Sequence, residues 1–170
     1  VLADARAALK NGIKIGKKNY QVEIVSKDSQ SNPNRAAEVT SQLILKDKVN
    51  LMIGSSTGDT VNPVSDQCEL NEMPCVTSDV PWQIAYFGRG ATPKKGFKWT
   101  YHFFWGIDDM IGVFMNMWSG LQTNKKLGSL IANDSDGVVA GHPKRGFRVP
   151  MSAGGYDYIQ PPIFNPGSND

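Results

Sequence analysis

The 170-residue sequence has only two cysteines, two histidines and no long apolar run. Cys68 and Cys75 lack the spacing of a zinc site, and His102 and His142 stand apart from other potential ligands. No apolar segment reaches the roughly 18 residues of a membrane helix. The 18 lysines and arginines are scattered and barely outnumber the 16 acidic residues, so no nucleic-acid surface is indicated. The sequence therefore argues against a metal site, a membrane span and a nucleic-acid partner.

Apolar residues follow strand-like and helix-like patterns in turn. Residues 50–53 form a short apolar run that ends at Gly54, residues 60–71 have helical spacing, and residues 74–77 form a second run. Strand, small polar loop, helix and strand make one unit of a parallel sheet. Further strands are expected at 20–26, 101–105, 127–132 and 156–159, and helices at 2–11, 33–48, 107–121 and, more weakly, 138–153; residues 81–98 look irregular. The sequence thus predicts an α/β fold with an open, mostly parallel sheet and helices on both faces.

The candidate binding site lies where two of these strands end, because ligands of open α/β sheets bind at the carboxyl ends of the strands. The first loop offers hydroxyl groups and the N–H groups of a helix start, which suit a carboxylate, and Gly58 allows close approach. The alternative is that these hydroxyl groups only cap the helix. The residues concerned are Ser55, Ser56, Thr57 and Gly58 in the first loop and Thr77, Ser78 and Asp79 in the second.

The motifs of catalysis are missing. The serines are not in a G-x-S-x-G elbow, and the sequence around Gly88 and Gly90 is not a dinucleotide fingerprint. Asp108 and Asp109 precede an apolar helix, where helix capping is the simpler interpretation. We expect no enzyme activity, no cofactor and no metal.

The two cysteines allow two interpretations. Cys68 lies late in a predicted helix and Cys75 begins the next strand, so both can point into one core. Two buried reduced thiols are the simpler interpretation. A disulfide closing a short loop is the alternative in an oxidising compartment.

Several segments resemble type I periplasmic solute-binding proteins of branched-chain amino acid ABC importers. The resemblance rests on KDSQSNPNRAAEVTSQLILKDKVNLMIGSSTGDT, MPCVTSD and KLGSLIANDSDG. It implies two flavodoxin-like lobes that close on a small solute, a membrane permease as partner, and a periplasmic location with a signal peptide upstream. Residues 1–122 would be most of lobe one without its first strand, and residues 123–170 the start of lobe two.

The resemblance also implies further contacts. Residues 77–79 would meet the polar head of the solute, with Asp79 receiving an amino group or acting as an ordinary turn residue. Trp82 would stack on the solute or belong to the core, and Asn133 and Ser135 would face the cleft from lobe two. The solute would be an amino acid, an amide or an aromatic acid. The alternative function is an intracellular flavodoxin-like regulator or enzyme with an anion site at residues 55–58.

The strand order of this fold gives one further expectation. In the order 2-1-3-4-5, the absent first strand would lie between the predicted strands at 20–26 and 49–54. We therefore expect these two segments not to pair directly.

Overall fold

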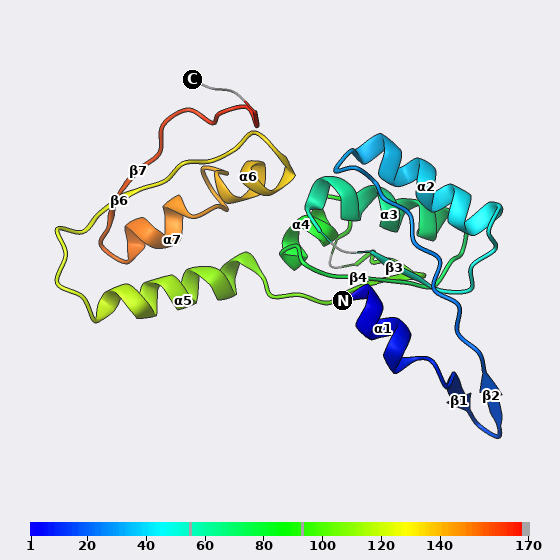
Figure 1. Cartoon of the computed structure of the whole chain (residues 1–170). Helices are drawn as coiled ribbons and strands as arrows, with labels where there is room; N and C mark the ends of the chain where they lie inside the picture. The colour runs from blue at the N-terminus through cyan, green and yellow to red at the C-terminus, as the bar shows by residue number, and fades with distance from the viewer. Residues whose placement is uncertain (55, 93, 168–170) are drawn as a thin grey trace.

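The computed structural model describes residues 1–54, 56–92 and 94–167. Two groups of elements are joined by residues 103–106, and a short arm precedes the first group (Figure 1). The arm consists of α1 (Leu2–Ala8), β1 (Ile13–Ile15) and β2 (Lys18–Tyr20). The first group holds α2 (Pro33–Leu45), β3 (Met52–Gly54), α3 (Gly58–Leu70), β4 (Cys75–Thr77), α4 (Trp82–Phe87) and β5 (Thr100–His102). The second holds α5 (Ile107–Ser119), β6 (Lys126–Gly128), α6 (Ser135–Ala140), α7 (Arg148–Ala153) and β7 (Asp157–Ile159).

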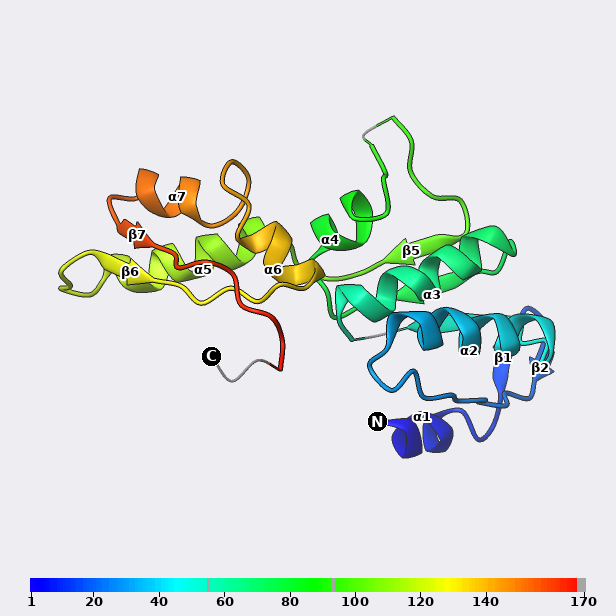
Figure 2. The same cartoon turned by 90° about the horizontal axis from the view of Figure 1, so that it is seen from above.

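Strands β3, β4 and β5 form a parallel sheet in that order. Side chains alternate across it: Met52 and Cys75 are buried, whereas Ile53 is 84% and Tyr101 65% exposed. Helices α2 and α3 lie side by side over the buried face (Figure 2). The predicted α/β class with a parallel sheet is confirmed.

Helix α2 follows from local sequence signals. The Asn32 side chain accepts a hydrogen bond from the N–H of Arg35 at 3.0 Å, and Pro33 occupies the first turn, where its missing N–H costs nothing. Ala36, Val39 and Leu43 then form the buried stripe. The helix predicted after Asn32 is therefore confirmed, and it ends at Leu45 rather than at Lys48.

One apolar core connects the two groups of elements. It contains Val61 of α3, Ile84 of α4, Ile111 of α5, Met151 of α7 and Tyr158 of β7. In the second group, β6 and β7 pair in parallel. No helix in the described part of the chain is long and apolar enough to cross a membrane.

The strand predicted at 20–26 is wrong. Tyr20 ends β2, which forms an antiparallel hairpin with β1, and residues 21–29 belong to no strand. The alternating pattern of this segment suits a strand, but a strand also needs a hydrogen-bonding partner, and β3 pairs only with β4 among the described residues. This segment and β3 do not pair in the described part of the chain. Because residues 21–26 form no strand, the expected order around the absent first strand stays a prediction.

Three other segments differ from expectation. The region 81–98, expected to be irregular, contains α4, which begins directly after Pro81. The weak helix at 138–153 is two short helices, α6 and α7, separated by residues 141–147 that include Pro143. The strands predicted at 101–105 and 127–132 are shortened to β5 and β6, because the residues that follow leave the ladder to form the crossing segment and the approach to α6.

Candidate functional site

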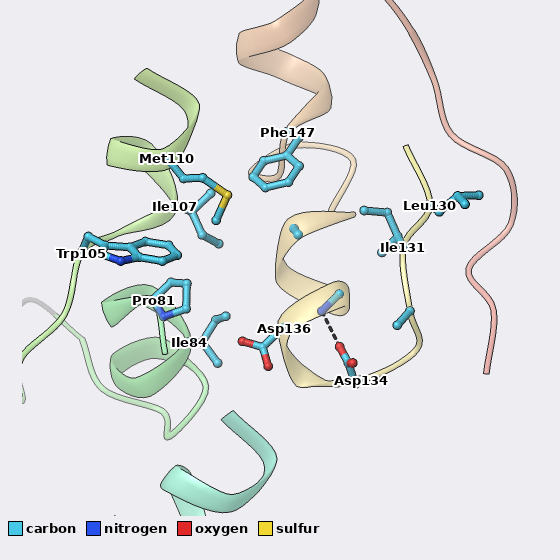
Figure 3. Close-up of a pocket in the computed structure, with 13 residues that line it drawn as sticks. Pro81, Ile84, Trp105, Ile107, Met110, Leu130, Ile131, Asp134, Asp136 and Phe147 are labelled. Carbon is cyan, nitrogen blue, oxygen red and sulfur yellow. Dashed lines mark hydrogen bonds between the residues drawn. The ribbon is translucent and has the colours of Figure 1, made fainter. Parts of the chain in front are cut away.

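A cavity of about 380 Å³ lies between two banks of residues (Figure 3). The first bank comes from the start of α4, from the segment that leads into α5 and from the first turn of α5. The second comes from the chain between β6 and α6, from α6 itself and from Phe147. The lining residues are Pro81, Ile84, Trp105, Ile107 and Met110 on the first bank and Leu130, Ile131, Ala132, Asp134, Asp136, Gly137, Ala140 and Phe147 on the second. The walls are mostly apolar, with two carboxylates on the second bank.

Hydrogen bonds fix the first bank. The N–H of Trp82 donates to the Trp105 carbonyl oxygen at 3.3 Å, and the N–H of Ile107 donates to Gln83 Oε1 at 2.9 Å. At the start of α5, the Asp109 side chain accepts from the N–H of Gly106 at 2.7 Å. These bonds join the beginnings of α4 and α5, so the Trp105 side chain has a defined place in the cavity wall.

The second bank depends on the start of α6. Asp134 caps this helix by accepting from the N–H of Gly137 at 2.7 Å. A Cβ atom at Gly137 would lie 1.9 Å from the Ala132 carbonyl oxygen, so only glycine allows this close approach of two backbone segments. An isolated parallel β-bridge between Ala132 and Phe164 also holds the segment that contains Ala132 in place.

Asp136 connects the second bank to α3. Its Oδ2 accepts from the N–H of Gly58, the first residue of α3, at 3.4 Å. Burial raises the pKa of Asp136, and the nearby carboxylates of Asp134 and Asp59 raise it further, while the Gly58 N–H opposes this change. A carboxylate thus lies at the helix start where the sequence predicts an anion site.

The first predicted loop is only partly placed. Ser55 lies outside the described residues. Ser56 and Thr57 are exposed, and Ser56 has a φ of 123°, a backbone conformation that non-glycine residues rarely adopt. Thr57 occupies the cap position of α3, yet its side chain makes no capping hydrogen bond. The capping interpretation is therefore not realised for Thr57, and solute binding by this loop stays a prediction.

The second predicted loop contributes supporting rather than lining groups. Thr77 is buried, and its hydroxyl group bonds His102 Nδ1 at 2.8 Å. The N–H of Ser78 donates to the Gly54 carbonyl oxygen at 3.1 Å, which ties the end of β4 to the end of β3. Asp79 is exposed and has a φ of 66°. None of these three residues lines the cavity.

Trp82 does not line the cavity. It lines a separate groove of about 360 Å³ together with Tyr86, Phe97 and Tyr101. Its ring packs against those of Tyr86 and Phe87, with centroid distances of 6.4 and 5.6 Å. The aromatic residues in the wall of the cavity are instead Phe147 and Trp105, and the sequence assigns Trp105 to a strand.

On the second bank, the predicted residues adjoin the cavity without lining it. Asn133 is exposed and donates to Asn165 Oδ1 at 3.0 Å. The Ser135 Oγ atom is buried without a hydrogen-bond partner and lies next to Gly58. Asp136 was missed as a site residue, although its place one residue after Ser135, in a segment expected to face the cleft, is a signal that the sequence carries.

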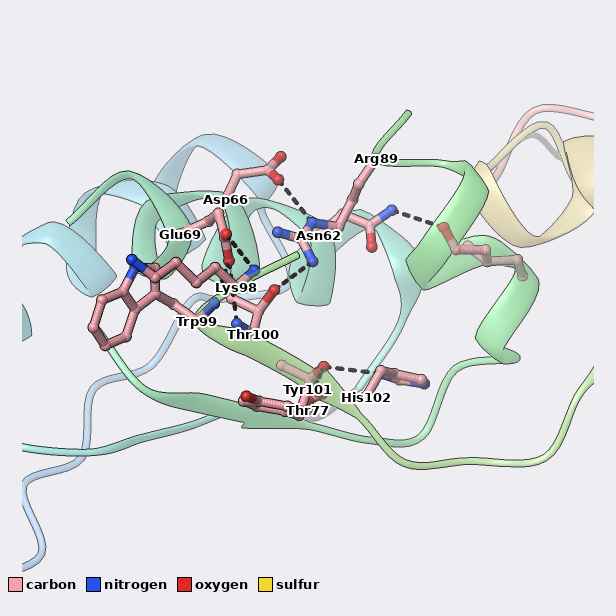
Figure 4. Close-up of polar contacts among 11 residues, drawn as sticks. Asn62, Asp66, Glu69, Thr77, Arg89, Lys98, Trp99, Thr100, Tyr101 and His102 are labelled. Atoms are coloured by element: carbon pink, nitrogen blue, oxygen red, sulfur yellow. Dashed lines mark hydrogen bonds and ion pairs between the residues drawn. The ribbon is translucent and has the colours of Figure 1, made fainter. Parts of the chain in front are cut away.

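A second polar cluster ties β5 to α3 (Figure 4). One carboxylate, that of Glu69, accepts from the N–H groups of Lys98, Trp99 and Thr100 at 2.7, 2.9 and 3.1 Å. Burial alone would raise the pKa of Glu69, but these N–H groups outweigh it and hold its pKa below the ordinary value. The partners of this carboxylate are all internal, which indicates a structural role.

Arg89 belongs to the same cluster. Its guanidinium group bonds Asp66 Oδ1 at 2.7 Å and Thr100 Oγ1 at 2.9 Å, and it lies 3.7 Å from the centre of the Phe97 ring. The Arg89 side chain is only 4% exposed. It fastens the segment after α4 to α3 and β5. Among the described residues no group of three histidine, cysteine or acidic side chains could hold a metal ion.

The chain matches a family model described as periplasmic binding protein over residues 2–170. The chain belongs to the periplasmic binding protein family. This membership implies a location outside the cytoplasm. The comparison with curated proteins gives no match.

Solved structures of solute-binding proteins share the fold of this periplasmic binding protein. A periplasmic binding protein from Burkholderia mallei is similar with a TM-score of 0.72 and 15% identity, over 99% of this chain and 41% of that chain. The branched-chain amino acid transporter substrate-binding protein LivJ from Streptococcus pneumoniae, in complex with isoleucine, has a TM-score of 0.66 and 19% identity, over 98% and 43%. A solute-binding protein of an ABC transporter from Rhodopseudomonas palustris, in complex with 3,4-dihydroxybenzoic acid, has a TM-score of 0.66 and 15% identity, over 96% and 40%. The chain thus spans about 40% of the length of these relatives.

Proposed function

We propose that this chain is part of an extracytoplasmic receptor of an ABC importer that binds a small organic solute in the cavity between the two banks. The observation that carries the proposal is the meeting of both banks around one apolar cavity, with the Asp136 carboxylate at its edge on the start of α3. Binding sites for small molecules are typically concave, mostly apolar and supplied with a few polar groups. The receptor would deliver the solute to a membrane permease and would not change it chemically.

The two banks would belong to the two lobes. We propose that residues 1–122 belong to lobe one and residues 123–170 to lobe two. This division places α5 at the end of lobe one, while the buried face of α5 packs with Met151 of α7. Helix α5 would therefore connect the lobes, and residues 103–106 would form the crossing next to the cavity.

The cavity walls indicate the class of solute. Trp105, Phe147 and the aliphatic residues suit a solute with an aliphatic or aromatic body. Asp136 suits a group that donates hydrogen bonds, such as an ammonium or amide group, and disfavours a second carboxylate. Among amino acids, amides and aromatic acids, we propose that a solute with an amino or amide group binds more tightly than an aromatic acid without one.

A calorimetric titration tests this function. The protein is titrated with isoleucine, phenylalanine, phenylalanine amide, benzoate and 3,4-dihydroxybenzoate, with glucose as a control solute. We expect saturable binding of at least one amino compound, weaker binding of the two acids, and no binding of glucose. Absence of heat with every solute of the panel would contradict the proposal for these solute classes.

The second candidate, a flavodoxin-like intracellular regulator or enzyme with an anion site at residues 55–58, lacks a supporting observation of its own. The family match favours the receptor. Chemical turnover of any bound solute, detected by mass spectrometry, would support the enzyme hypothesis instead.

A further inference from the structure

Cys68 and Cys75 lie together in the core, although they come from different elements. Cys68 is in the last turn of α3 and Cys75 is the first residue of β4. Their exposed fractions are 0% and 1%, and both are free thiols in this structure, as the simpler interpretation of the sequence has it. Each thiol shifts the pKa of the other, so the two side chains are neighbours. Both pack in one cluster with Leu43, Ile44 and Met52.

The connection between the two elements fixes this arrangement. The N–H of Met73 donates to the Cys68 carbonyl oxygen at 2.8 Å, which closes the end of α3. The N–H of Met52 donates to the Pro74 carbonyl oxygen at 2.9 Å, and the N–H of Cys75 donates to the Trp99 carbonyl oxygen at 2.9 Å. Because the backbone on both sides of the turn is held by hydrogen bonds, the contact between the thiols is a feature of the fold rather than of free side chains.

We propose that Cys68 and Cys75 form a disulfide when the chain folds in an oxidising compartment. A bond forms between the two Sγ atoms, and the two thiols release two protons and two electrons. A disulfide oxidant, such as oxidised glutathione or the disulfide of an oxidoreductase, accepts the electrons, and its own S–S bond breaks to give two thiols. This inference does not depend on which solute the cavity binds.

The burial of both sulfur atoms determines when the bond forms. An external disulfide cannot reach either sulfur atom in the folded chain, since both residues are almost fully covered. The exchange therefore takes place while α3 and β4 are still docking.

The test is a refolding experiment on the full chain. The reduced, unfolded chain is refolded in a mixture of reduced and oxidised glutathione, then unfolded without reductant and alkylated with iodoacetamide. We expect the mass of the unreduced chain to show no added alkyl group. After reduction and a second alkylation, the mass should show two added alkyl groups. Trypsin leaves both cysteines in one peptide because no lysine or arginine lies between Lys48 and Arg89, but cleavage after Glu72 separates them. Two peptides linked until reduction would locate the bridge.

Two controls make the experiment decisive. The Cys68→Ala variant keeps only Cys75, which has no partner for a disulfide within the chain. After excess reduced glutathione has removed any glutathione bound to Cys75, this variant should take up one alkyl group. Adding the oxidant after folding under reducing conditions should leave two thiols on the natural chain. Two alkyl groups after oxidative refolding, or bridges between separate molecules, would overturn the proposal, and rapid bridging of the folded chain would overturn the folding-stage step.

Discussion

Asp136 combines three properties that are common among residues of functional sites. It is partly buried, it lies near two other carboxylates, and it accepts a hydrogen bond from the first residue of α3, a helix outside both banks. Burial and the neighbouring charges raise its pKa, so the ionised carboxylate destabilises the folded chain. Ionisable groups with such environments cluster at functional sites, which is the reason to place Asp136 in the proposed solute site.

The stability of an Asp136→Asn variant tests this description. A carboxyl group whose pKa is raised on folding holds its proton more tightly in the folded chain than in the unfolded chain, so stability is lost as the pH rises above the ordinary value of 3.8. Asparagine keeps an oxygen for the Gly58 N–H and cannot ionise. We expect the variant to unfold at a higher urea concentration at pH 7, with a smaller difference at pH 4. Asp157→Asn, on the exposed edge of β7, is the matched control; an equal gain there would contradict the account.

Glu69 has the opposite relation to pH. Three N–H groups hold its pKa below the ordinary value of 4.5, so its contribution to stability is present above that pH and is lost as the pH falls below it. We expect Glu69→Gln to lower the free energy of unfolding at pH 7 by about 1.5–3 kcal/mol, as for hydrogen bonds to charged groups. Urea titrations at pH 7 and pH 3 should show the difference shrinking in acid. Glu72→Gln, at an exposed position three residues later, should change little at either pH.

At the scale of elements, helices and strands that depend on local signals could be predicted from the sequence, whereas those that depend on long-range contacts could not. Helix α2 was predicted because a capping asparagine, a first-turn proline and an apolar stripe are all local. The strand at 20–26 was predicted wrongly because alternation records which side chains could be buried, whereas a strand also requires a partner. The short helix α4 was missed because glycines and a proline dominate its surroundings.

In the candidate site, too, features with local sequence signals could be predicted and those that depend on long-range contacts could not. The start of α3 was predicted as an anion site from its hydroxyl groups and helix position, and this stays a prediction, since the group that meets the Gly58 N–H here is the carboxylate of Asp136 from the same chain. Trp105 could not be placed, since it reaches the cavity only through the way the segment 103–106 is set against α4. Asp136 was missed, although its segment was expected to face the cleft. Trp82 lines a separate groove rather than this cavity, because strand ends indicate where a site lies but not which way a helical side chain turns.

A substitution in α6 tests how closely the backbone of the second bank is packed. Alanine at Gly137 would place a Cβ atom against the Ala132 carbonyl oxygen, which is backbone and cannot turn away. We expect Gly137→Ala to destabilise the chain by more than about 1 kcal/mol, the lower end of the cost of overpacking. Gly112→Ala, in α5 with open space around the new methyl group, should instead stabilise by about 0.5–1 kcal/mol. Thermal unfolding of both variants would measure this, and a neutral Gly137→Ala would contradict the described packing.

At the scale of the whole molecule, the two groups of elements share one core and one cavity. The core joins α3 and α4 to α5, α7 and β7, and the cavity opens beside it, where the first group meets the second. A receptor that closes on its solute needs its binding groups on both sides of such a cavity. The account therefore places the solute between Trp105 of the first bank and Phe147 and Asp136 of the second.

The most direct test is a titration of the best-binding solute of the panel into three proteins: the natural chain, Trp105→Ala and Phe103→Ala. Both substitutions remove an aromatic ring from the crossing segment, but only Trp105 lines the cavity, and Phe103 is 81% exposed. We predict that Trp105→Ala weakens binding at least about tenfold, the equivalent of about 1.4 kcal/mol, while Phe103→Ala binds like the natural chain. Equal affinities of all three proteins would contradict the placement of the solute in this cavity.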